Sequence, residues 1–142
     1  MKKRIAIILG SILLLILLFI FTDYLKKTTF GESLTGAGID QDNVLEIYIE
    51  DASDLSNRRS VIIRDKDLIK NLLDYSMDMK LKRTNELPEK VTFFVNFLLS
   101  SGSEIYTHIG ANDFQIGSHY SIKGENKFIT FIENQELNWE SH

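Results

Sequence analysis

The first hydrophobic stretch of the chain, Ile5 to Phe21, contains seventeen consecutive residues without a charge. At about 1.5 Å of rise per residue, a helix over residues 5–22 is roughly 27 Å long, which approaches the hydrocarbon thickness of a bilayer. Lys2, Lys3 and Arg4 precede the stretch, and so short a basic tail favours the cytoplasmic side. The sequence therefore predicts a cytoplasmic tail at residues 1–4, a transmembrane signal anchor at residues 5–22, and a remainder outside the cell.

A secretory signal that is cleaved after export is the minor alternative. Signal peptidase needs small side chains soon after the apolar core, whereas residues 19–24 read Phe-Ile-Phe-Thr-Asp-Tyr and the first small cluster lies at residues 36–38. The chain contains no cysteine, which excludes a lipid-modified cysteine and any disulfide. The anchor is therefore expected to remain uncleaved.

The segment after the anchor is acidic. Residues 39–142 carry eighteen acidic and eleven basic residues, a net charge of −7. Such a charge argues against nucleic-acid binding, because that binding neutralises phosphates with a cationic surface. About one hundred residues suffice for one domain with one core. The polar, glycine-containing segment 23–43 is predicted to be a flexible linker, followed by an extracytoplasmic domain at residues 44–138 and a tail at residues 139–142.

The domain alternates between strand and helix patterns. Period-two or continuous apolar runs predict strands over residues 44–50, 60–64, 77–82, 91–99, 104–109, 114–116 and 119–123. Helical spacing predicts a helix over residues 66–76, capped by Asp65, and a second helix that begins at Asn126. The expected fold is α+β: an antiparallel sheet with two helices packed on one of its faces.

Three segments carry a resemblance to a known group. The sequences VLEIYIE, SVIIRDKDLIKNLL and IGSHYSIKGENKFITFIEN, within residues 43–134, resemble the small exported domains of unknown function found in Gram-positive bacteria. Such domains often follow a membrane anchor or a lipoprotein signal. The resemblance implies a location and a fold, and it supplies no catalytic residues.

The central strand, Val91–Leu99, predicts a candidate interaction face. If its alternate side chains Val91, Val95 and Phe97 face the helices, the others lie on the opposite side of the sheet. Aromatic side chains on an open sheet face are typical of a protein docking surface, although the second helix or the linker could equally cover them. The predicted interaction face consists of Tyr48, Phe94, Asn96, Leu98, Tyr106 and His108.

Other candidate sites have simpler explanations. His108, His119 and Asp113 could form a two-histidine, one-carboxylate metal site, but their spacing matches no known metal motif, so no metal, cofactor or catalytic residue is expected. Lys80, Lys82 and Arg83 could, together with three arginines at positions 58, 59 and 64, dock an acidic wall polymer. A solvated strand face that prevents edge-to-edge pairing is the favoured interpretation of these cations.

These observations favour a non-enzymatic module that is anchored in the membrane and binds another envelope protein or a secreted protein. One alternative is an envelope enzyme or metal-dependent binding domain that uses the His108 and His119 region. Another is a subunit of a membrane complex that acts through its transmembrane helix.

Overall fold

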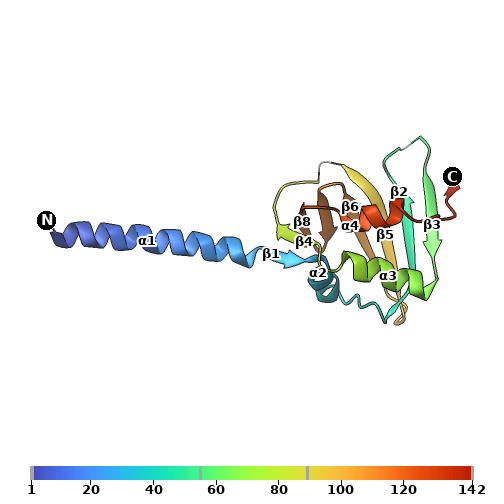
Figure 1. Ribbon diagram of the computed structural model, residues 1–142, viewed down its shortest axis with the longest axis horizontal. Coiled ribbons are helices and arrows are strands. Elements are labelled where there is room, and N and C mark those ends of the chain that lie inside the picture. Colours follow the sequence, from blue (N-terminus) through green and yellow to red (C-terminus); the bar gives the residue numbers. More distant parts are fainter. Residues whose placement is uncertain (1, 55, 89, 142) are drawn as a thin grey trace.

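A long apolar helix and a helix-covered sheet make up the part of the chain that the computed structural model describes, residues 2–54, 56–88 and 90–141 (Figure 1). Helix α1 (Lys2–Leu25) projects away from the sheet. It is long and apolar enough over Ile7–Leu25 to cross a membrane, and none of those residues is buried. The helix therefore suits a membrane anchor or a secretion signal.

The described residues contain a nine-stranded sheet in which every neighbouring pair is antiparallel. Its order is β1-β4-β8-β7-β6-β5-β2-β3-β9. The strands are β1 (Lys27–Thr29), β2 (Val44–Asp51), β3 (Arg59–Ile63), β4 (Lys80–Arg83), β5 (Val91–Leu99), β6 (Glu104–Gly110), β7 (Asp113–Ile116), β8 (Ser118–Lys123) and β9 (Glu140–Ser141). The expected α+β class and antiparallel sheet are confirmed.

Three short helices lie on one face of this sheet: α2 (Phe30–Gly36), α3 (Lys66–Ser76) and α4 (Lys127–Glu133). The core forms between them and alternate strand residues, such as Phe97 of β5, Leu72 of α3 and Phe128 of α4, all of which are fully buried. Asp65 caps α3 by accepting a hydrogen bond from the Leu68 N–H at 2.9 Å, as expected for an N-cap residue. The helices thus leave the other sheet face uncovered.

The strand expected from Met77 begins later, at Lys80. Met77 instead ends α3, because its N–H donates to the Leu73 carbonyl at 2.9 Å. Met79 is buried before the strand starts. Apolar residues alternate from Met77 onward, but the last hydrogen bond of the helix includes Met77, so the strand begins only at Lys80.

The segment expected to be a flexible linker, residues 23–43, instead comprises the end of α1 and, from Lys27 onward, the first part of the folded domain. Strand β1 pairs with β4, and α2 follows it directly. Phe30 is fully buried, and its ring lies 4.8 Å from that of Phe114 and 5.9 Å from that of Phe128. Thr29 and Glu32 form a reciprocal capping box at the start of α2, which satisfies two backbone N–H groups. The domain therefore begins at β1.

The expected tail, residues 139–142, also joins the fold as far as it is described. Strand β9 pairs with β3. The ring of Trp139 stacks on Phe93 with 6.1 Å between centroids, and the guanidinium of Arg59 lies 4.7 Å above Trp139. The last residues thereby close the edge of the core beside β3.

Asp51 fixes Arg59 at this edge. The Arg59 Nε donates to Asp51 Oδ2 at 2.9 Å, and Ser53 donates to Oδ1 through its N–H at 3.0 Å and its hydroxyl at 2.5 Å. Burial alone would raise the pKa of Asp51, but the hydrogen bonds from Ser53 and the Arg59 charge outweigh it, so the pKa lies below its usual value. Asp51 is therefore ionised and paired at neutral pH.

Candidate interaction face

Strand pairing brings the six residues of the predicted interaction face together on the sheet side opposite the helices. Asn96 of β5 lies opposite Tyr48 on one side and Tyr106 on the other. Phe94 lies opposite His108 in the next row. The buried residues of β5 are Phe93, Val95, Phe97 and Leu99, so the intervening side chains all point away from the core.

The face is only partly covered by its own side chains. Tyr106 is 69% exposed, and Tyr48, Phe94 and His108 are half-buried. The His108 ring meets Phe94 edge-on, with 4.9 Å between centroids and 79° between planes. These side chains line a shallow hollow of about 190 Å³. The result is an aromatic surface with a depression that a small apolar side chain can enter.

Ile62 extends the apolar surface beyond the residues predicted from sequence. It lies opposite Tyr48 on β3 and is 45% exposed. Val61 and Ile63 on either side of it are buried. Three consecutive β-branched residues gave no alternation to show which one faces outward, and only the pairing with β2 identifies it.

Carboxylates border the face, and two of the three are neutralised by arginine. Glu46 pairs with Arg64 at 2.7 Å, and Glu50 pairs with Arg58 at 3.2 Å. Glu104 forms no ion pair with any residue that the structure describes. It is the one carboxylate of this border whose charge stays uncompensated.

Glu104 is held by neutral donors on the face itself. The Tyr106 hydroxyl and the Asn96 Nδ2 both donate to Glu104 Oε2, the latter at 2.9 Å. These hydrogen bonds, that of Tyr106 first, lower the pKa of Glu104 and hold it ionised. The same hydrogen bond raises the pKa of Tyr106. The face thus presents a fixed negative charge beside exposed aromatic rings.

The two histidines and the aspartate considered for a metal site lie on this side of the sheet without converging. Gln115 lies between His108 and His119 in the pairing of β6, β7 and β8, which separates the two histidines by roughly 10 Å, two strand spacings. Across residues 2–54, 56–88 and 90–141, no group of three His, Cys, Asp or Glu side chains could hold a metal ion. These side chains therefore do not converge on a point where they could bind the same metal ion.

Comparisons with known proteins do not extend this description. Neither the models of known protein families, nor the curated proteins, nor the solved structures contain a match to the chain. The interaction face and the apolar helix α1 are therefore the features from which a function can be inferred.

Proposed function

We propose that the chain is a membrane-anchored module that binds another envelope protein or a secreted protein through the interaction face. One observation carries this proposal: among the residues that the structure describes, three helices cover one side of the sheet and no element covers the aromatic, hollowed side (Figure 1). An apolar surface of this kind is a common mark of a protein interaction site in a soluble domain. Catalysis finds no comparable support, since the two histidines lie apart.

The chemistry of the face supports a partner of a particular kind. Exposed Tyr106 and Ile62 offer apolar contact area, and ionised Glu104 has no cationic partner among the residues that the structure describes. A protein segment with an apolar side chain for the hollow and a lysine or arginine for Glu104 complements both features. Charge pairs across an interface raise specificity and association rate, and tyrosines commonly dominate binding energy.

The apolar helix α1 supports the proposed location. Helix α1 begins with basic residues, and only Lys26 separates it from the folded domain. Residues 19–24, Phe-Ile-Phe-Thr-Asp-Tyr, offer no small-residue cleavage site. An uncleaved anchor with its N-terminus in the cytoplasm presents the sheet outside the cell. The resemblance to small exported domains of Gram-positive bacteria supports the same location.

Site-specific photocrosslinking tests the proposal in living cells. Benzoylphenylalanine replaces Tyr106 on the interaction face or, as the matched control, Tyr75 of α3, which is 43% exposed on the helix side. We expect one discrete crosslinked species from position 106 and none of that mass from position 75. Identical crosslinks from both positions would show that the interaction face is not selective.

A charge reversal tests the chemistry of the partner. We expect Glu104→Lys to abolish the crosslink from position 106, and the control Glu136→Lys, at another exposed acidic position, to preserve it. Replacing residues 5–21 with an unrelated apolar anchor should also preserve the crosslink. Its loss on that replacement would favour the alternative in which α1 itself binds the partner within the membrane.

A further inference from the structure

The end of helix α1 is fixed directly to an edge of the sheet. Only Lys26 separates α1 from β1, and the Lys26 carbonyl accepts a hydrogen bond from the Arg83 N–H of β4 at 2.8 Å. Headgroups occupy about 5–8 Å on each side of the hydrocarbon core. If α1 spans the membrane, strands β1, β4 and β8 therefore lie at the depth of the phosphate groups.

Lysines face one another across these three strands. Lys27 of β1 lies opposite Lys82 of β4, and Lys80 of β4 lies opposite Lys123 of β8. Like charges directly opposite each other in a sheet are destabilising. The domain therefore places four cations together at a cost to its own stability.

Among the described residues, carboxylates form ion pairs with only one of these two lysine pairs. Asp23 at the end of α1 forms ion pairs with both Lys82 and Lys27, at 3.7 Å for Lys27. Among the described residues no carboxylate lies within ion-pair distance of Lys80 or Lys123. The nearby Asp78 is paired with Lys127 at 2.7 Å, and this hydrogen bond, with a smaller contribution from the charge of Lys80, lowers the pKa of Asp78.

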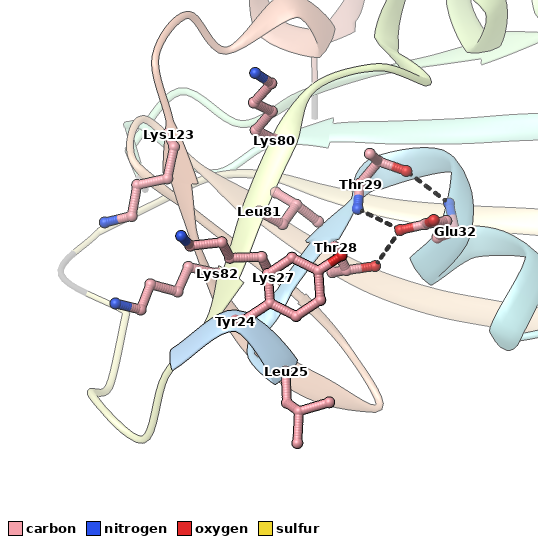
Figure 2. Close-up of a pocket in the computed structure, with 10 residues that line it drawn as sticks. All are labelled: Tyr24, Leu25, Lys27, Thr28, Thr29, Glu32, Lys80, Leu81, Lys82 and Lys123. Carbon is pink, nitrogen blue, oxygen red and sulfur yellow. Dashed lines mark hydrogen bonds between the residues drawn. The ribbon is translucent and has the colours of Figure 1, made fainter. Parts of the chain in front are cut away.

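A cavity of about 770 Å³ lies between these lysines and the end of α1. Figure 2 shows the side chains of Lys27, Lys82 and Lys123 extending to the same side, with Tyr24 beside them. Tyr24 and Leu25 provide an exposed apolar wall toward α1. The cavity is thus cationic toward the sheet and apolar toward the anchor.

One carboxylate also lines the cavity, and it is engaged. Glu32 Oε2 accepts hydrogen bonds from the Thr28 hydroxyl at 2.8 Å and the Thr29 N–H at 2.9 Å (Figure 2). The lining therefore contains four lysines and a single carboxylate. The local charge is positive although the domain as a whole is acidic.

We propose that this cavity binds the phosphate headgroup of an anionic phospholipid from the leaflet in which α1 ends. The lysines hold the phosphate, and Tyr24 and Leu25 contact the glycerol and the first carbons of the acyl chains. An amphipathic ligand matches a cavity with one cationic and one apolar wall, which a soluble phosphate does not. This assignment rests on the membrane anchoring proposed above and not on the interaction face.

Native mass spectrometry of the full chain in detergent micelles tests this assignment by measuring lipid binding. Phosphatidylglycerol, phosphatidylcholine or inorganic phosphate is titrated, and bound molecules are counted. We expect the wild-type chain to prefer phosphatidylglycerol over phosphatidylcholine. In Lys80→Gln/Lys123→Gln this preference should fall roughly 30-fold, equivalent to about 1 kcal/mol for each charge.

Two variants separate the site from general charge. Lys66→Gln/Lys90→Gln removes two exposed lysines elsewhere and should keep the preference, and Lys80→Arg/Lys123→Arg should keep it as well. Equal affinity for the two lipids, or an equal loss in both glutamine variants, overturns the assignment. Displacement of phosphatidylglycerol by equimolar inorganic phosphate would identify a soluble phosphate as the ligand and overturn the lipid source. Release of the chain from membranes by alkaline carbonate would refute the anchoring instead, independently of the micelle measurement.

Discussion

The burial of Phe30 makes the start of the domain open to a direct test. Phe30 is fully buried and contacts two aromatic rings, those of Phe114 and Phe128. Its N–H also donates to the Met79 carbonyl at 2.9 Å. Phe30→Ala therefore leaves a cavity in the core between α2, α4 and the sheet.

The size of the effect follows from that burial. Replacing a buried phenylalanine by alanine costs about 3–5 kcal/mol of unfolding free energy, and two aromatic neighbours place Phe30 near the middle of that range or above it. A loss of about 4 kcal/mol is a large part of the 5–15 kcal/mol that stabilises a typical domain. At a slope of about 2 kcal/mol per molar urea, the midpoint should fall by about 2 M.

Urea unfolding of the full chain in detergent micelles measures this change. The single tryptophan, Trp139, reports the unfolding of the sheet because it stacks on Phe93. It belongs to the segment before β9, at the far edge of the strand order from β1. A shift seen by Trp139 therefore shows that α2 and the whole sheet unfold together.

The control is Phe21→Ala in α1, where the side chain is 58% exposed and the unfolding midpoint should not change. If residues 23–43 were a flexible linker, Phe30→Ala would change the free energy of unfolding by no more than about 0.5 kcal/mol, as exposed substitutions usually do. That result would refute the conclusion that β1 and α2 belong to the domain.

Three further predictions use the same unfolding measurement. Gly110→Ala should cost about 1–3 kcal/mol, because an added Cβ would lie 2.5 Å from the Lys90 carbonyl oxygen, whereas Gly36→Ala, with open space around it, should be neutral or stabilising. Thr29→Ala removes the cap of α2 and should cost about 1 kcal/mol. Asp51→Asn should cost about 1–3 kcal/mol at neutral pH. Because the folded pKa of Asp51 is lowered, the wild-type chain should lose this advantage as the pH falls below 3.8, and a constant difference between the two proteins down to low pH would contradict it.

Local pattern predicted those elements whose residues alternate or repeat clearly. Strand β5 and helix α3 have the predicted bounds, Val91–Leu99 and Lys66–Ser76. In α3, a cap at Asp65 and apolar residues at helical spacing point to the same structure. Agreement between a capping signal and periodicity made this helix predictable.

The segment 23–43 was misread because its composition outweighed a short motif. Threonine, serine and glycine are typical of linkers, but Thr29 and Glu32 are spaced as a capping box. The decisive contacts are long-range: Phe30 packs against Phe114 and Phe128, which lie far away in the sequence. No local window contains that contact, and the same holds for Trp139 on Phe93.

The sequence predicted which side chains of β5 share one side of the sheet, but not the surroundings of those side chains on the folded surface. Alternation in β5 assigned Phe94, Asn96 and Leu98 to one side, and the structure places them there. The ionic setting of Glu104 required the pairing of β5 with β6, and the lysine cavity required β1, β4 and β8 to become neighbours. The register of β5 with β6, and the pairing of β1, β4 and β8, which lie far apart in the sequence, depend on the folded sheet, and local patterns supplied neither.

The central claim, that an uncleaved anchor presents the sheet outside the cell, is tested most directly by single-cysteine labelling, since the chain has no cysteine of its own. Leu87, the site of Leu87→Cys, lies in a loop and is 83% exposed, and Lys3, the site of Lys3→Cys, is one of the basic residues at the start of α1. With a membrane-impermeant maleimide on intact cells, we predict labelling at position 87 and none at position 3, both in a full-length, membrane-bound chain. Labelling at position 3 with protection at position 87, or a shortened chain in the medium, would contradict the account.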